Sequence, residues 1–265
     1  MGKPKKVENV YLGLVYLFIY LPVLVLFVFS FNSSKLNIVW QGFTFDWYIK
    51  LMSSSSDVMA AFWNSIFVAT GTTIVSTIIG TLGAIGMSKY KFPGKKSLDA
   101  ILYIPIVIPE IVLGIALLSY FTTIKIPLGM TALIIAHSSF CIPFVINNVK
   151  TRLAGFDRSV EEASLDLGAN RWQTLRRVII PIIMPGITAG AMLSFALSMD
   201  DIIISFFVTS SNSTTLPVKI LSMVRTGVTP EVNALCILLL LLSVVLVGGA
   251  NLINAKRDKN FGMDE

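Results

Sequence analysis

Long apolar runs without charged residues constrain this chain more than any other feature. A helix of about 20 residues crosses the hydrocarbon core of a membrane, and backbone amides in lipid must find hydrogen-bond partners within their own segment. Strands of a membrane barrel would alternate in polarity instead. Six runs qualify as predicted spans: Val10–Phe31, Val58–Ser88, Ala100–Ile124 (interrupted only by Glu110), Ile126–Val149, Val178–Met199 with a continuation Ile202–Val208, and Val232–Ala255. The sequence therefore predicts an all-α, polytopic membrane protein.

Composition excludes the main soluble classes. Hydrophobic residues make up 54% of the 265 residues and charged residues only 14%, whereas soluble domains carry about 25% charged residues. Both cysteines, Cys141 and Cys236, fall inside apolar runs, so no disulfide framework is available. A soluble, disordered or disulfide-stapled fold is thereby excluded.

The basic residues predict an orientation. Of the 21 Lys and Arg, all but five lie in the two tails and in the loops that follow the second and fourth spans. Cytoplasmic loops are enriched in Lys and Arg, so both termini are expected in the cytoplasm of a cell-membrane protein. This topology also accounts for the pI of about 9.3. We interpret the first run as a retained span, because it is longer than the apolar core of a signal peptide and no cleavage pattern follows it.

Three parts are expected along the chain. Residues 1–57 form an N-terminal tail, the first span and an outer loop. Residues 58–255 form a five-helix core that includes a cytoplasmic loop at 150–181, and residues 256–265 form a cytoplasmic tail. The first outer loop is rich in aromatic residues and predicts a short interfacial helix, which suits an aromatic belt or a surface for a partner. Pro217 predicts the start of an amphipathic helix in the last outer loop.

The loop before Pro181 carries the richest local signals. Ser159 and Glu162 have the spacing of a capping box, which predicts the start of a helix at Ser159. Gly168 predicts its end about two turns later, because glycine adopts the left-handed conformation without steric cost. Asn170 is a second cap signal and opens a helix that runs toward Pro181.

One face of the first of these short helices is apolar and partly small. Val160, Ala163, Ser164 and Leu167 share it at the helical spacing. Small residues let another surface approach the backbone closely. The face is either an interaction element for a partner or a surface that packs on the chain's own membrane helices.

These residues also carry a resemblance to a known family. The loop resembles the EAA loop of ABC importer permeases, in which Glu-Ala-Ala is followed by Gly and then by Ile-x-Leu-Pro. The matching residues are Glu162-Ala163-Ser164, Gly168 and Val178-Ile179-Ile180-Pro181. The departures are Ser164, Val178 and Ile180, each mild in size or shape. Asn64-Ser65, at the start of the second span, is also similar to the family.

The C-terminal third narrows the resemblance. It is similar to the second permease subunit of spermidine/putrescine ABC importers in Ser194-Phe195-Ala196-Leu197-Ser198-Met199-Asp200-Asp201, Ser205-Phe206, Leu216-Pro217-Val218-Lys219-Ile220 and Pro230-Glu231-Val232-Asn233-Ala234-Leu235. The resemblance implies a type I ABC importer permease fold, and a heterodimer with a homologous permease. It further implies two ATPase subunits that bind ATP and Mg, an extracytoplasmic polyamine-binding protein, and no cofactor in this chain. The coupling residues that it implies are Val160, Glu161, Glu162, Ala163, Ser164, Leu167, Gly168 and Pro181.

Acidic residues within the predicted spans are candidates for substrate contact. Glu110, Asp200 and Asp201 would each be costly at bilayer depth unless they faced protein, water or a ligand. A protonated amine 4 Å from a carboxylate gains about 4 kcal/mol at an effective dielectric of 20, so one or two acids per step suit transport. Aromatic faces that offer cation–π contacts are those of Trp63, Tyr103, Tyr120 and Phe195.

Other interpretations of the polar residues stay open at this point. The acids can instead form structural pairs with Arg225, Lys125 or a partner. Adjacent helical residues point about 100° apart, so one Asp of the pair can line a cavity while the other packs. His137 is expected to be a packed, hydrogen-bonded imidazole rather than a proton relay.

Two other functional classes have weaker support in the sequence than an ABC permease. A membrane enzyme finds no support, because no metal cluster, nucleophile motif or phosphate-binding loop stands in the sequence. An ion-coupled secondary transporter is disfavoured because no internal repeat is visible. A permease for another small organic cation is the nearest alternative.

Overall fold

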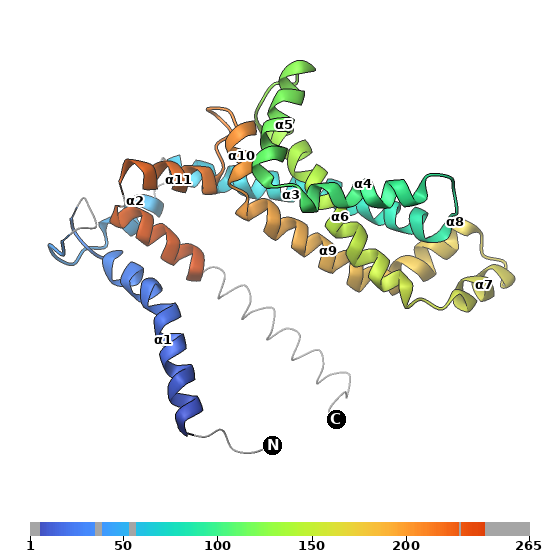
Figure 1. Cartoon of the computed structure of the whole chain (residues 1–265), viewed down its shortest axis with the longest axis horizontal. Coiled ribbons are helices and arrows are strands. Elements are labelled where there is room, and N and C mark those ends of the chain that lie inside the picture. The colour runs from blue at the N-terminus through green and yellow to red at the C-terminus, as the bar shows by residue number, and fades with distance from the viewer. Residues whose placement is uncertain (1–5, 35–38, 53–56, 228, 242–265) are drawn as a thin grey trace. The chain divides into compact units, whose positions relative to one another are not determined.

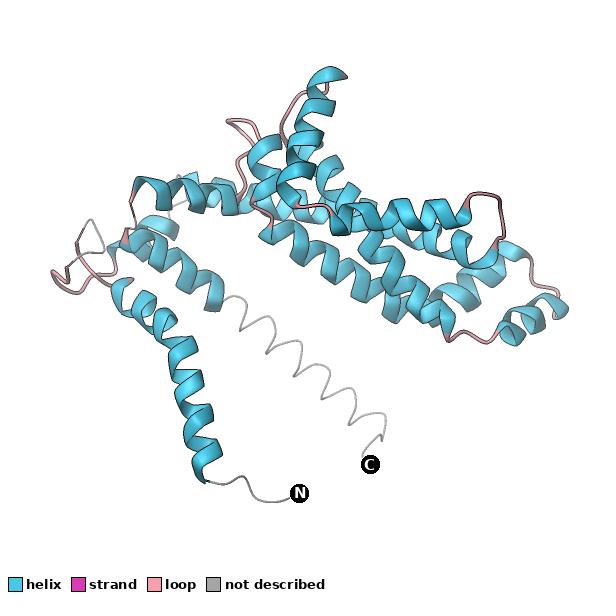
Figure 2. Cartoon of the chain, in the orientation of Figure 1, coloured by secondary structure: helices cyan, strands magenta, loops and turns pink. Residues whose placement is uncertain are grey.

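The computed structural model describes residues 6–34, 39–52, 57–227 and 229–241, and these ranges contain helices and loops but no β-strand (Figures 1 and 2). An isolated bridge pairs Asn32 with Phe43. The helices are α1 (Lys6–Phe29), α2 (Asp46–Met52), α3 (Asp57–Lys89), α4 (Lys95–Val107), α5 (Glu110–Thr123), α6 (Met130–Ala154), α7 (Arg158–Asp166), α8 (Arg171–Thr174), the π-helical segment η1 (Leu175–Ile179), α9 (Ile180–Asp200), α10 (Ile203–Val208), α11 (Leu216–Thr226) and Pro230–Leu241.

Contacts divide the chain into two units. The first unit comprises Met1–Met59 and Ile220–Glu265, and the second comprises Ala60–Lys219. The expected tail at 256–265 lies outside the described residues, and the three-part division of the chain stays a prediction.

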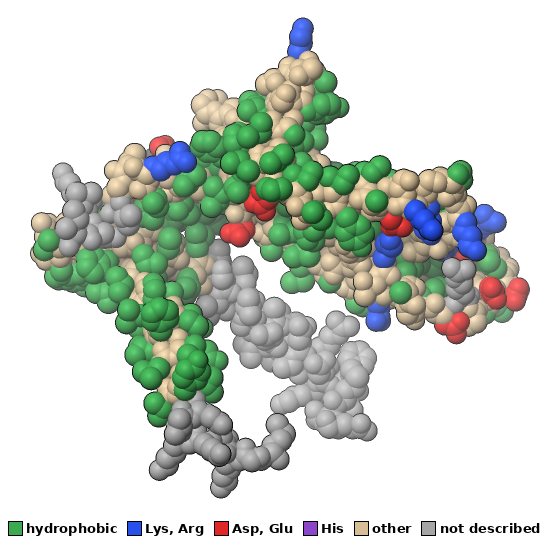
Figure 3. Space-filling view, in the orientation of Figure 1, with side chains coloured by type: hydrophobic (Ala, Val, Ile, Leu, Met, Phe, Trp, Pro, Cys, Tyr) green, Lys and Arg blue, Asp and Glu red, His purple; other side chains and the backbone are tan. Residues whose placement is uncertain are grey.

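Four helices in the described residues are long and apolar enough to cross a membrane. They are α1, α3, α6 and the continuous helix Arg171–Asp200, and a broken pair, α4 with α5, qualifies if it is counted as one span. Most large apolar side chains of α1 are exposed, as lipid-facing residues would be (Figure 3). The predicted all-helical membrane architecture is therefore confirmed. Of the predicted last span, Val232–Ala255, only residues 232–241 fall in the described part of the chain, within the helix Pro230–Leu241.

The third predicted span is not one straight helix, and this part of the prediction was wrong. α4 and α5 meet at an angle of 108°. Pro109 precedes α5 directly, and Ile108 before it is extended, with ψ of 135°, because the proline ring disfavours helical conformation in the preceding residue. Glu110 is consequently the first residue of α5 rather than a residue within a continuous span.

Two other boundaries differ from the sequence-based expectation. α6 begins at Met130, later than predicted, because Gly129 before it has φ of 136°, which helical residues do not adopt. The predicted continuation of the fifth span is a separate helix, α10. Asp201 has extended geometry, with ψ of 121°, and ends α9.

α6 lies at the centre of the second unit. α9 lies along its length, and α4 and α10 also contact it (Figure 1). Glycines bring the backbones close, since a Cβ added to Gly190 would lie 3.1 Å from Val145 Cα. Two apolar clusters fill the unit. One joins α3, α5, α6 and α10, and the other joins α3, α6, η1 and α9.

The two short helices that the sequence predicts, in the loops expected outside, are present. α2 supplies Tyr48, whose hydroxyl lies 2.7 Å from Ser30 Oγ, and Trp47, whose Nε1 donates to the Asn32 carbonyl at 2.8 Å. In the last outer loop α11 has Pro217 as its second residue, where the missing N–H does no harm.

A candidate coupling helix and a buried polar network

The N-cap of α7 lies two residues earlier than the capping box predicted. Asp157 is its N-cap, with Oδ1 accepting from the Ser159 backbone N–H at 2.9 Å. The expectation that Ser159 caps the helix was wrong, because a carboxylate two residues upstream competes successfully for the same amide. This hydrogen bonding from Ser159 holds the pKa of the Asp157 carboxyl below its ordinary value of 3.8.

α7 ends at Gly168 as predicted. The glycine has φ of 87°, its N–H donates to the Leu165 carbonyl at 2.9 Å, and the Ala169 N–H donates to the Ser164 carbonyl at 3.1 Å. This pair of bonds is the Schellman motif, which satisfies carbonyls that the last turn leaves free. A Cβ at Gly168 would meet nothing within 4 Å, so the requirement for glycine here is one of backbone conformation alone.

The helix that follows has the complete capping box. Asn170 Oδ1 accepts from the Gln173 N–H at 2.8 Å, and Gln173 Oε1 accepts from the Asn170 N–H at 2.9 Å. The helix runs toward Pro181 as predicted, and it also continues past this residue, through η1 into α9. Proline has no N–H for the carbonyl four residues earlier, so the turn widens and the Ile180 N–H donates to the Leu175 carbonyl.

The apolar face of α7 lies open. Leu167 is 90% exposed and Val160 is 42% exposed. A groove of about 430 Å³ runs along this face, lined by Val160, Ala163, Ser164, Leu167, Ala169, Gln173, Arg177 and Val178. Ser164 Oγ also lies 3.1 Å from the buried Thr174 hydroxyl, which ties α7 to α8.

The opposite side of α7 faces the end of α3. Lys89 and Glu161 form an ion pair that bridges the two helices. A second groove, of about 630 Å³, lies beside this pair and is lined by Ile85, Lys89, Tyr90, Glu161, Glu162, Leu165, Arg171, Trp172 and Leu175. Figure 3 shows charged side chains gathered at the end of the unit that carries α7 and α8.

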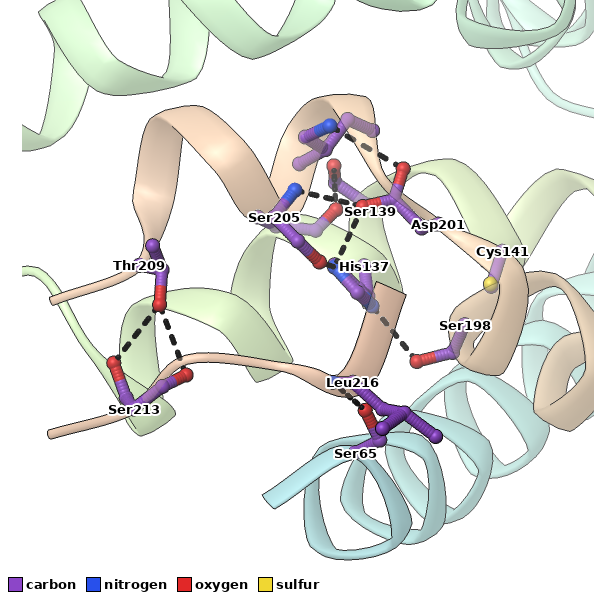
Figure 4. A network of polar contacts seen from close by, with 12 residues as sticks. Ser65, His137, Ser139, Cys141, Ser198, Asp201, Ser205, Thr209, Ser213 and Leu216 are labelled. Atoms are coloured by element: carbon purple, nitrogen blue, oxygen red, sulfur yellow. Dashed lines mark hydrogen bonds and ion pairs between the residues drawn. The ribbon is translucent and has the colours of Figure 1, made fainter. Parts of the chain in front are cut away.

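A polar network is buried where α9 breaks (Figure 4). His137 on α6 is fully buried, with Nδ1 2.7 Å from Ser198 Oγ on α9 and Nε2 3.1 Å from Ser205 Oγ on α10. Its Nε2 also lies 3.3 Å from Asp201 Oδ2. The Asp201 carboxylate in turn accepts from the backbone N–H groups of Ser205 at 2.7 Å and Ile204 at 3.3 Å. The expectation that His137 is packed and hydrogen-bonded is confirmed.

The comparisons with known proteins decide the family. Residues 76–259 match the family of the binding-protein-dependent transport system inner membrane component. The chain belongs to that family. The permease is 44% identical over 250 residues to the spermidine/putrescine transport system permease protein PotC of Shigella flexneri, which covers 94% of both chains. It is 38% identical to PotC of Haemophilus influenzae, over 95% of this chain and 97% of that one.

Further relatives agree with this assignment. The permease is 37% identical to the putrescine transport system permease protein PotI of Escherichia coli strain K12, over 87% of this chain and 84% of that one. In fold it is similar to a chain of a bacterial ABC transporter involved in the import of the acidic polysaccharide alginate, with a TM-score of 0.69, 16% identity, and 97% and 99% of the two chains covered. The predicted ABC permease fold and transport role are thereby confirmed, and the permease is an inner-membrane component.

The acids that the sequence singled out occupy different environments in the permease. Glu110 and Asp200 are exposed, whereas the side chain of Asp201 is only 3% exposed and belongs to the buried network. α5 packs against α10, since a Cβ at Gly114 would lie 3.5 Å from Ile204 Cα. Glu110 stands one turn before Gly114, so the breaks that begin α5 and α10 lie at the same end of this helix pair.

The predicted aromatic candidates are also distributed over the permease. Trp63, Tyr103 and Tyr120 are exposed and Phe195 is half-buried, and the Tyr103 hydroxyl donates to Asn147 Oδ1 at 3.2 Å. Sequence reasoning missed Lys89 and Thr174, because nothing in their local pattern indicates a partner about seventy or ten residues away. The contacts of all these residues with a substrate or with an ATPase stay predictions.

Proposed function

We propose that this permease is the transmembrane subunit of an ATP-driven polyamine (spermidine/putrescine) importer, and that it forms the translocation path together with a homologous permease. The observation that carries the proposal is its 44% identity, over 94% of the chain, to a permease named for spermidine and putrescine transport. An extracytoplasmic polyamine-binding protein delivers the substrate to the outer face.

The proposed membrane arrangement has six spans. The α4–α5 pair forms the third as a broken helix, and Pro230–Leu241 opens the sixth. Both termini face the cytoplasm, on the side that carries most Lys and Arg residues. The expected parts are 1–57, the core at 58–255 with its coupling loop at 150–181, and the tail at 256–265.

In this proposal, ATP hydrolysis in the partner subunits is coupled to transport through α7. Two ATPase subunits bind ATP and Mg and hydrolyse ATP, and this chain is not itself an enzyme. The exposed side chains of Leu167 and Val160 support docking of an ATPase subunit at α7. Burying a leucine side chain in such an interface contributes about 1.5–3 kcal/mol. Ala163 and Ser164 allow close approach, while Glu161, Glu162, Gly168 and Pro181 shape the element and its connection to α9.

The substrate amine groups contact Glu110 and Asp200 in turn. Both carboxylates are exposed, and both stand at breaks of membrane helices, which is where transporters place binding groups. Asp201, the third candidate, acts through the buried network rather than by contact. Trp63, Tyr120 and Phe195 supply aromatic faces to the alkylamine.

The test is uptake of labelled spermidine into proteoliposomes that hold the permease with all its partners. We expect spermidine uptake to require ATP inside the proteoliposomes and to be inhibited by putrescine. Neutral solutes should not inhibit it. Uptake that is driven by an ion gradient without ATPase subunits would refute the assignment. Preference for another small organic cation would correct the substrate while keeping the mechanism.

A second arm of the test addresses the proposed cation site. Asp200→Asn should raise the KM for spermidine at least about tenfold, equivalent to about 1.4 kcal/mol of lost attraction. Asp46→Asn removes an exposed carboxylate from the first turn of α2 and serves as the matched control, with no expected change in KM. An unchanged KM in Asp200→Asn would remove this residue from the site.

A further inference from the structure

The imidazole of His137 contacts both sides of the break between α9 and α10. Residues 201–202 separate α9 from α10. His137 reaches Ser198 before the break and Ser205 after it, from a third helix, α6 (Figure 4). Its exposed fraction is zero, so no water competes for these bonds. The angle between α9 and α10 is therefore fixed by a side chain that belongs to neither helix.

Both carboxylate oxygens of Asp201 have partners in the same network. One carboxylate oxygen faces His137 Nε2 at 3.3 Å and accepts from the Ser205 N–H at 2.7 Å, while the other accepts from the Ile204 N–H at 3.3 Å. These amides belong to the N-terminal turn of α10, whose partial positive charge favours a carboxylate. A carboxylate with two backbone donors, an imidazole nitrogen 3.3 Å away and 3% exposure offers no open face to a passing amine.

Holding Asp201 inward has a consequence for its neighbour. Asp200 is the last residue of α9, and Asp201 after it is extended. With the Asp201 side chain tied to α6 and α10, the Asp200 side chain turns away from the network, and it is exposed. The same network orients α10, which in turn supports α5 through the contact of Gly114 with Phe207, where an added Cβ would lie 2.7 Å from the ring.

We propose that His137 is a positioning residue for cation transport. Together with Asp201 it locks the break between α9 and α10, and so presents Asp200 to the substrate. The proposal rests on the proposed function for its transport consequences. It also predicts a geometric change that does not depend on transport.

The geometric test labels a cysteine placed at position 200. Asp200→Cys is introduced into the assembled transporter, and its reaction with a cationic methanethiosulfonate reagent is followed by mass spectrometry of the peptide that holds position 200, separate from those with Cys141 and Cys236. Adding His137→Leu should change the labelling rate at least about threefold. An unchanged rate would overturn the positioning role.

The matched control for this experiment is Ser139→Ala. Ser139 stands on the same helix two residues away, but its hydroxyl donates to the Ala136 carbonyl of its own helix at 2.7 Å, and among the described residues it forms no hydrogen bond to another element. The control should leave labelling and uptake unchanged. His137→Gln, which keeps one donor and one acceptor, should restore both toward the values of the unchanged protein, whereas a general packing defect would persist in it.

The kinetic test separates positioning from direct contact. His137→Leu and Asp201→Asn should each raise the KM for spermidine about tenfold. The double variant should have the same KM as either single variant, because both substitutions disrupt the same network at the break between α9 and α10. Defects that multiply would show that Asp201 contacts substrate by itself and would overturn the proposal. A normal KM in Asp200→Asn would refute the proposed cation site, while the labelling result at position 200 would still decide the role of His137.

Discussion

Gly168 offers the sharpest test of the coupling helix. Its φ of 87° closes α7, and a Cβ would meet nothing within 4 Å. Gly168→Ala therefore introduces a single perturbation, the conformational strain of an L-residue in the left-handed region. That strain amounts to about 1–2 kcal/mol, which lowers the population of the closed Schellman end by about five- to thirtyfold.

The chain contains a control for this substitution. Gly94, at the start of α4, has φ of 86° and equally open surroundings, so Gly94→Ala carries the same strain at a site outside α7. Gly168→Asn provides a second control, because asparagine tolerates the left-handed conformation better than alanine does.

The assay is ATPase activity stimulated by substrate-loaded binding protein, with uptake measured in the same proteoliposomes. We expect Gly168→Ala to lose several-fold in both, Gly168→Asn to lose less, and Gly94→Ala to stay near the unchanged protein. Gly168→Asp, which places a negative charge at the C-terminus of α7, should also lose activity, and more than Gly168→Asn does. All four should insert normally. Equal losses in Gly168→Ala and Gly94→Ala would show that strain as such is harmful and would refute the reasoning.

Three further predictions concern other contacts. Lys89→Glu should reduce uptake per ATP by about two- to fivefold, as expected for the loss of a partly buried ion pair worth about 0.5–1 kcal/mol. Adding Glu161→Lys restores an ion pair with the charges exchanged and should recover the uptake. If uptake does not recover, the ion pair does not transmit motion. The pKa of the Asp157 carboxyl is lowered from 3.8, so its cap stabilises α7 above that pH and the stabilisation is lost as the pH falls through the lowered pKa. The protection factors of the α7 amides, which are exchange rates corrected for the intrinsic rate at each pH, should therefore fall over that range, and Asp157→Asn should remove this change. Gly80→Ala would place a Cβ 2.7 Å from a side chain of α6 and should lower the unfolding free energy by about 1–3 kcal/mol, whereas Gly86→Ala, with open surroundings, should not; equal melting temperatures would contradict this packing.

Much of the fold could be predicted because its determinants are local. The apolar runs predicted the helical membrane architecture, since in lipid a helix satisfies the backbone hydrogen bonds of such a segment within the segment itself. Gly168 and Asn170 were recognisable as helix boundaries for a similar reason, because each acts on amides or carbonyls within a few residues. The cap at Asp157 was missed only because two acceptors compete for one amide, and pattern matching chose the wrong one.

Tertiary structure decided which polar groups face inward. The sequence indicates that Asp200 and Asp201 point in different directions but not which of them packs, and only the packing of α6 against α9 and α10 places Asp201 beside His137 and leaves Asp200 exposed. Pro109 marked the place of the bend before Glu110, but its angle of 108° is seen only in the structure, where α4 contacts α6 and α5 contacts α10. The physical reason is range. Hydrophobicity and capping depend on neighbours in sequence, whereas the partners of His137 lie more than sixty residues away, and their side-chain directions exist only once three helices have come together.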